Sequence, residues 1–205
     1  MAEQQKHLQL REKVALVTGA SRGIGAAAAK RLGQSGASVI INYHQNREAA
    51  QRVLDEIQAA GGQGILFQAD VTRRDQVDLM IQAAREQYRA IDVLVNNAYF
   101  PFQVGQLHEL SWEDFHRAIE HELMAFYNCV QACLPDMAQR KSGKIIVVST
   151  RLAQQPLARM GAYAAAKSAL ESMANTMAIE LGPLGINVNV VTPAFTLTDA
   201  SLIMP

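Results

Sequence analysis

The sequence predicts a doubly wound α/β domain, in which helices cover both faces of a parallel sheet. Short runs rich in Val and Ile alternate along the chain with longer segments whose apolar residues recur at helical spacing. The first of these runs, at residues 14–17, lacks polar alternation, which is typical of a strand buried on both faces. No repeat or linker interrupts the pattern, so the 205 residues are expected to form one three-layer α/β/α domain.

Six strands and five helices are expected from this alternation. The strands are placed at residues 14–17, 38–43, 64–69, 91–95, 144–149 and 186–191. Asn46 and Ser111 have the side chains and positions of helix N-caps, and Asp114 follows Ser111 in the acidic first turn. The helix that Ser111 begins is predicted to run towards Pro135. Residues 1–12 form a polar extension, and residues 13–205 form the domain.

Composition excludes several classes of partner. Nineteen basic residues balance nineteen acidic ones, so no global field favours nucleic acid or an anionic membrane. No apolar run is long enough to cross a bilayer, and the N-terminus lacks the apolar core of a signal peptide, which predicts a cytoplasmic location. Cys129 and Cys133 have no neighbouring cluster of His or Cys, so buried thiols are expected and no metal site.

A glycine-rich turn joins the first strand to the first helix. It reads Thr-Gly-Ala-Ser-Arg-Gly-Ile-Gly from Thr18 to Gly25. Gly19, Gly23 and Gly25 permit a sharp bend and let an anion approach the backbone N–H groups that open the helix. A glycine-rich connection without a ligand is the alternative. The buried strand before the turn and the helix after it favour a dinucleotide site of the Rossmann type.

Tyr163 and Lys167 lie one turn apart on a predicted helix, with only alanines between them. A solvated pair is the alternative interpretation. A free tyrosine has a pKa of about 10, and a lysine beside it favours the phenolate and lowers that pKa. A phenol so placed can deliver a proton to a carbonyl oxygen as hydride reaches the carbon.

Together these motifs resemble the classical short-chain dehydrogenase/reductase family, and most of all its bacterial 3-oxoacyl-(acyl-carrier-protein) reductases. Asp70-Val71, Asn96-Asn97-Ala98 and Pro193 stand in the family's order between and after the two motifs above. The resemblance implies Tyr163 as the acid/base, and Lys167 as the group that lowers its pKa and binds the nicotinamide ribose. The cofactor-binding residues that it implies are Gly19, Ser21, Arg22, Gly23, Ile24, Gly25, His44, Asp70, Val71, Asn97, Ala98, Tyr163, Lys167, Pro193 and Thr196.

The sequence departs from the family at positions near the reaction centre. Thr150 stands where the family has serine, thirteen residues before Tyr163, and it keeps the hydroxyl. The adjacent Ser149 should point to the opposite face of the strand, so Thr150 is the predicted catalytic hydroxyl. Tyr99 and Ala194 replace glycines and should crowd the nicotinamide end of the pocket. The family's last strand and substrate-covering segment are not found in this chain.

Glu122 is a further departure, because the family has asparagine there to hold a proton-relay water. A carboxylate can accept from such a water or pair with Lys167. Pairing would stabilise the ammonium and leave Tyr163 harder to ionise. Glu122 is therefore counted with Thr150, Tyr163 and Lys167 among the catalytic candidates.

NADP(H) is predicted in preference to NAD(H). An NAD site usually has an acid at the end of the second strand, but no carboxylate occurs there before Glu48. Arg22 is placed to meet a 2′-phosphate, assisted by Arg47 or His44.

The predicted function is NADPH-dependent reduction of a small-molecule ketone to a secondary alcohol, with a 3-oxoacyl thioester as one candidate substrate. The alternative is a catalytically weakened protein of the same fold that acts as a nucleotide-binding or assembly partner. A homodimer or homotetramer is implied by the resemblance, through the helices that follow Ser111 and contain Tyr163. Leu170, Met173, Met177 and Ile179 give the second of these helices more than one apolar face.

Overall fold

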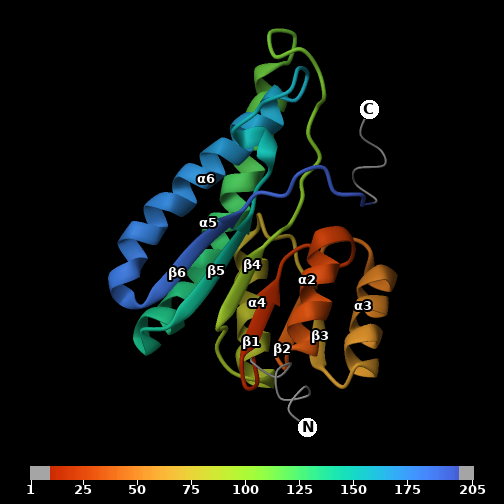
Figure 1. Ribbon diagram of the computed structural model, residues 1–205, viewed down its shortest axis with the longest axis vertical. Helices are drawn as coiled ribbons and strands as arrows, with labels where there is room; N and C mark the ends of the chain where they lie inside the picture. The colour runs from red at the N-terminus through yellow and green to blue at the C-terminus, as the bar shows by residue number, and fades with distance from the viewer. Residues whose placement is uncertain (1–9, 199–205) are drawn as a thin grey trace.

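A computed structural model describes residues 10–198 and contains one six-stranded, fully parallel sheet (Figure 1). Most of the polar extension and the last residues of the chain lie outside that range. The strand order is β3-β2-β1-β4-β5-β6. The strands are β1 (Val14–Val17), β2 (Ser38–Tyr43), β3 (Gln63–Gln68), β4 (Val93–Asn96), β5 (Gly143–Val148) and β6 (Ile186–Val191). This is the doubly wound arrangement expected from the sequence, and the order reverses between β1 and β4.

Helices cover both faces of the sheet. One face carries α2 (Gly23–Gln34) and α3 (Arg47–Ala59). The other carries α4 (Arg74–Gln87), α5 (Trp112–Arg140) and α6 (Gly161–Leu181). Two short 3₁₀ turns, η1 (Arg151–Ala153) and η2 (Gly182–Leu184), flank α6. No described helix is long and apolar enough to cross a membrane.

The core is divided by the sheet into two clusters because successive strand residues point to opposite faces. Leu16 and Leu94 pack with the α4–α6 side. Val17 and Val95 pack with α2 and α3. All four side chains are less than 5% exposed, which explains why the strands read as unbroken apolar runs. Cys129 and Cys133 are both buried on the α5 side, as expected.

Both predicted N-caps are confirmed. The Asn46 side chain accepts a hydrogen bond from the Ala49 N–H at 2.9 Å, at the start of α3. The Ser111 hydroxyl accepts one from the Asp114 N–H at 3.1 Å, at the start of α5. Each cap satisfies an N–H that has no partner inside its helix.

The predicted end of α5 is wrong, because the helix continues through Pro135 to Arg140. Proline has a helical φ and costs mainly the hydrogen bond that its missing N–H would have made. Pro135 is exposed, so the carbonyl one turn earlier is near solvent. Met137 is fully buried just beyond it, and packing of that last turn offsets the lost bond.

The carboxyl ends of the strands lie at one edge, where the loops that bear the sequence motifs converge. α5 and α6 lie side by side and extend beyond this edge (Figure 1). After β6 the chain crosses back over the edge towards the start of α2, where Thr198 lies against Gly23. The edge is therefore bounded by the glycine turn on one side and by α6 on the other.

Candidate active site

The glycine turn between β1 and α2 has no room for side chains at two of its glycines. Gly19 has φ of +61°, and a Cβ there would lie 2.8 Å from the Ala98 Cα. A Cβ on Gly25 would lie 2.6 Å from the Gly19 carbonyl oxygen and would overlap the Asn97 side chain. These overlaps explain the glycines by packing within the protein and leave the outer side of the turn to the N–H groups of α2.

The start of α2 has features of an anion-binding site. Arg22 is the N-cap residue, its side chain makes no capping hydrogen bond, and the first turn contains no acidic residue. The positive end of the helix dipole is therefore not neutralised by a local carboxylate. Ser21 and Ile24 are half-buried beside it, and Arg22 is exposed. The donors and the glycine turn fit the pyrophosphate of a dinucleotide.

Thr18 ties the turn to the end of β4. Its side chain is fully buried, and its hydroxyl accepts hydrogen bonds from the Asn97 N–H at 2.9 Å and the Ala98 N–H at 3.0 Å. The Asn97 amide in turn donates to the carbonyl oxygens of Thr18 and Gly19. Asn97 and Ala98, both predicted to line the cofactor, are thus held against the glycine turn.

Replacing Thr18 by valine is expected to lower the free energy of unfolding by about 2 kcal/mol or more, since two buried N–H groups lose their acceptor. Valine keeps the shape of the side chain, so loss of packing contributes little. Urea denaturation measures the change. Thr176→Val is the control, because Thr176 is exposed and bonds only a carbonyl one turn back in α6. Equal stability of the Thr18 variant and the control would contradict this role.

Asn42, at the end of β2, is a site residue that the sequence reasoning missed. It is 2% exposed, accepts from the Gly19 N–H at 3.1 Å and donates to the Ala69 carbonyl at 3.0 Å. One side chain thus joins the ends of three neighbouring strands. A polar residue inside the run Val-Ile-Ile-Asn-Tyr was the available signal.

Asp70 and Val71 follow β3, and the structure gives them different environments. Burial raises the pKa of the Asp70 carboxyl, but hydrogen bonds from the Thr72 hydroxyl and N–H outweigh it, and the pKa falls below its usual value. Val71 is buried in the core, and its carbonyl accepts from Asn128. Its side chain therefore faces away from any cofactor, and only its backbone can contribute.

Three other predicted cofactor residues lie around the same edge. His44 is exposed after β2, with its carbonyl bonded by Gln68. The Pro193 carbonyl accepts from the Arg151 N–H at 3.2 Å and so joins the segment after β6 to η1. Thr196 is exposed and bonds the Ala194 carbonyl. None of the three contacts the glycine turn directly in the hydrogen bonds described.

Tyr163 is in the first turn of α6, and the Thr150 hydroxyl lies near enough to its phenol to lower the pKa of the phenol. The neighbouring Ser149 hydroxyl instead donates to the Glu171 carboxylate at 2.6 Å. The two adjacent hydroxyls therefore point to different places, as strand alternation predicts. Thr150, and not Ser149, is the hydroxyl at the tyrosine.

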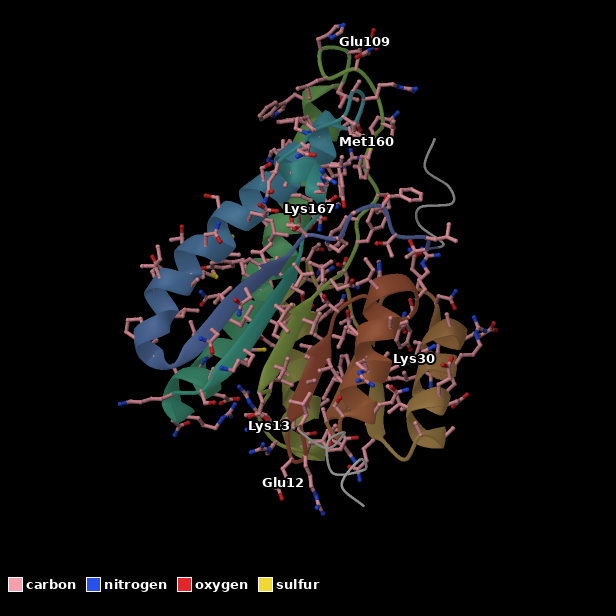
Figure 2. The ribbon with its side chains drawn as sticks, in the orientation of Figure 1. Glu12, Lys13, Lys30, Glu109, Met160 and Lys167 are labelled. Carbon is pink, nitrogen blue, oxygen red and sulfur yellow. The ribbon has the colours of Figure 1, made fainter. Side chains whose placement is uncertain are left out.

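Lys167 and Glu122 form a buried ion pair between α6 and α5. The Lys167 Nζ lies 2.9 Å from the Glu122 Oε2, and the side chains are 6% and 4% exposed. Lys167 also donates to the Val148 carbonyl at 3.2 Å. Its Nζ is 5.9 Å from the centre of the Tyr163 ring. In Figure 2, Lys167 lies partway along α6, closer to the sheet than Met160 at the protruding end. Of the two alternatives for Glu122, the structure contains direct pairing.

The pKa of Tyr163 differs from the expectation that Lys167 would lower it. Burial is the largest cause, and together with the Glu122 carboxylate it raises the pKa of Tyr163 to about 12, although the Thr150 hydroxyl acts in the opposite direction. The main reason is burial of the phenol, and a second is that Glu122 neutralises the ammonium that was expected to favour the phenolate. Burial also raises the pKa of Glu122, with Lys167 opposing this.

An aromatic contact at Tyr163 was not predicted. Phe102, in the loop between β4 and α5, stacks on the Tyr163 ring with centroids 4.7 Å apart and planes at 17°. Tyr99 meets Phe102 edge to face, with centroids 6.3 Å apart. A run of aromatics from Tyr99 to Phe102 was the available signal. Within residues 10–198, no cluster of His, Cys, Asp or Glu could hold a metal ion.

Comparisons with known proteins agree with this geometry. The family model "short chain dehydrogenase" matches residues 13–202. A 3-oxoacyl-(acyl-carrier-protein) reductase of Synechocystis sp. is 39% identical over 93% of this chain and 76% of its own length. The corresponding reductase of Staphylococcus epidermidis is 36% identical, over 91% of this chain and 76% of its own length.

Solved structures show the same arrangement. A short chain dehydrogenase of Burkholderia cenocepacia, in complex with NADP, is 39% identical with a TM-score of 0.84, over 93% of this chain and 77% of that one. A dehydrogenase/reductase of Sinorhizobium meliloti is 33% identical with a TM-score of 0.86, over 97% and 78% of the two chains. The fold, the order of the motifs and these matches together show that the chain belongs to the short-chain dehydrogenase/reductase family of oxidoreductases.

Proposed function

We propose that this protein reduces a ketone to a secondary alcohol with NADPH, and that Tyr163 donates the proton. The observation that carries the proposal is the placement of the Tyr163 phenol beside the Thr150 hydroxyl and Lys167, whose Nζ is 5.9 Å from the centre of the Tyr163 ring. Bound NADPH would supply hydride to the carbonyl carbon. The Thr150 hydroxyl would hold the carbonyl oxygen beside the phenol, so that the proton passes over one hydrogen bond.

The raised pKa of Tyr163 keeps the phenol in the protonated form that a proton donor needs, although it also makes the phenol a weaker acid than an ordinary tyrosine. With a pKa of about 12, the phenol remains protonated at neutral pH. Reduction consumes that proton, so the resting state of the side chain is the reactive one. Lys167 would bind the nicotinamide ribose with a proton not given to Glu122 or Val148, since an ammonium has three donors.

NADPH is favoured over NADH by the charges at the adenosine end. No carboxylate stands at the end of β2, where the Asn42 side chain is engaged with Gly19 and Ala69. Arg22 is exposed at the start of α2, and its guanidinium suits a 2′-phosphate. The Burkholderia relative was solved with NADP.

Arg22→Ala is expected to weaken NADPH binding about 10- to 100-fold, because charge-assisted hydrogen bonds to the 2′-phosphate are lost. NADH has no such phosphate, so its affinity should change little. Calorimetric titration with both cofactors measures the difference. Arg31→Ala is a matched control, since Arg31 is exposed at the other end of the same helix. Equal losses for NADPH and NADH would refute the assignment.

A 3-oxoacyl thioester is the substrate class that the named relatives suggest. Steady-state NADPH oxidation against a panel of simple ketones and 3-oxoacyl thioesters tests both the reaction and the substrate. Turnover of any member supports the proposal. Cofactor binding without turnover of any member would favour the second candidate function.

That second candidate is a protein that binds the nucleotide or a partner without turnover. It is favoured by the buried Glu122–Lys167 pair, which holds the lysine in an ion pair, and by Phe102, which covers one face of Tyr163. Both features alter the reaction centre and leave the glycine turn unchanged.

A homo-oligomer is also proposed, with a small-molecule substrate and neither nucleic acid nor membrane as partner. Trp112, Met124 and Tyr127 of α5 are 73%, 41% and 48% exposed, which is unusual for large apolar side chains. On α6, Ile179 is exposed. Leu170, Met173 and Met177, the other apolar residues predicted for an interface, pack on the core instead. Light scattering at micromolar concentration should give a dimer or tetramer, and Tyr127→Glu should reduce the mass. A monomeric mass for the parent protein would disprove the proposed homo-oligomer.

A further inference from the structure

The loop between β4 and α5, residues 97–111, is built against the first turn of α6. Phe102 lies face to face with Tyr163, and Tyr99 lies edge to face with Phe102. Both distances fall in the range in which aromatic pairs attract one another. The three rings form one continuous surface, called here the aromatic wall.

Two contacts fix the loop at the start of α6. The Gly105 N–H donates to the Arg159 carbonyl at 3.1 Å. Leu107 packs so closely on Gly161 that a Cβ there would lie 3.0 Å from its Cδ1. Phe102 is therefore held against Tyr163 by a loop anchored at two further points, and the stack is part of the fold of this loop.

The polar contact of Tyr163 is at its phenol oxygen, and its apolar contact is on a face of its ring. Its oxygen meets the Thr150 hydroxyl, whereas a face of its ring is covered by Phe102. A carbonyl that reaches the phenol oxygen must therefore place a substituent beside the aromatic wall. Tyr99 is 42% exposed and Phe102 is half-buried, so this surface remains open to a ligand.

We propose that Phe102 selects ketones that carry a flat apolar group, such as an aryl ring, next to the carbonyl. The substituent would extend the stack that Phe102 and Tyr163 already form, and a saturated ring of equal size could not lie flat against it. This inference rests on the proposed function and names the class of substrate for the same site.

The first measurement is kinetic. The ratio of kcat/KM for acetophenone to kcat/KM for cyclohexyl methyl ketone is determined in the parent protein and in Phe102→Leu. The two ketones have the same number of carbon atoms. They differ in intrinsic reactivity, but that difference is the same for both proteins and cancels when the two ratios are compared. The ratio should fall about 10-fold in Phe102→Leu. Phe115→Leu is the control, because Phe115 contacts Trp112 at the start of α5 and should leave the ratio unchanged.

The second measurement is binding, and it separates failure of this inference from failure of the proposed function. Benzamide carries the aromatic ring of acetophenone, and cyclohexanecarboxamide carries the saturated ring of cyclohexyl methyl ketone. Neither amide is reduced. Calorimetry in the presence of NADPH should show tighter binding of benzamide, with the preference lost in Phe102→Leu. That result without any ketone turnover would retain the inference and reject the proposed function. Turnover with both preferences unchanged in Phe102→Leu would overturn the inference and retain the function.

Discussion

Tyr163→Phe is expected to lower kcat for ketone reduction by about a thousandfold, within the range typical of a lost general acid. Only the phenol oxygen is removed. The ring remains, so its stack on Phe102 is kept. Thr150 can hold the carbonyl oxygen but is too weak an acid to replace the proton donor. Stopped-flow or steady-state measurement of NADPH oxidation gives the loss in kcat.

Cofactor affinity provides the control for that variant. NADPH should bind Tyr163→Phe nearly as well as the parent protein, because the glycine turn and Arg22 are untouched. Lys167→Ala should instead lose both activity and part of the affinity. A Tyr163→Phe protein that reduces ketones at the parent rate would eliminate the mechanism.

Glu122→Gln is expected to move the alkaline limb of the pH–rate profile for reduction to lower pH. Reduction needs the protonated phenol, so its rate falls as pH rises through the pKa of Tyr163. In the parent protein Glu122 helps to raise that pKa to about 12, and the limb lies near that pH. The amide removes the negative charge, and Lys167 then favours the phenolate, so the pKa falls. Rates measured from neutral to alkaline pH should begin to fall at a lower pH in the variant than in the parent protein.

Stability should also respond, because an unpaired ammonium is left in the interior. Complete loss of one partner of a buried pair costs about 3–5 kcal/mol, and less is expected here because the amide oxygen can still accept from Lys167. Glu171→Gln is the control, since Glu171 bonds Ser149 and not Lys167. A variant that loses stability with an unmoved pH profile would show that Glu122 acts only in packing.

The fold could be predicted because its information is local. Each strand is a short segment rich in apolar residues, most of them Val and Ile, and the caps at Asn46 and Ser111 are read from a few neighbouring residues. The end of α5 was wrongly placed at Pro135, because the low helix propensity of proline describes an average over many proteins. Here burial of Met137, two residues later, outweighs the missing hydrogen bond.

The sequence predicted the directions of neighbouring side chains where strand alternation decides them, as for the Thr150 hydroxyl near Tyr163 and the Ser149 hydroxyl on Glu171. Contacts between segments that are distant in the sequence could not be predicted from the sequence. Phe102 is 61 residues from Tyr163, and Glu122 is 45 residues from Lys167. The sequence offered a relay water or a pair for Glu122, and only three-dimensional packing distinguishes them. The expected fall in the pKa of Tyr163 was wrong for the same reason.

The position of Asn42 restricts how cofactor preference could be redesigned or could drift. An aspartate introduced there to hold a ribose hydroxyl would still accept from Gly19. It would, however, place a carboxylate oxygen where the Asn42 amide now donates to the Ala69 carbonyl at 3.0 Å. The repulsion would loosen the ends of β2 and β3 together with the glycine turn, for which we propose a role in cofactor binding. A change of cofactor is therefore more accessible at exposed His44, where a new charge disturbs no strand.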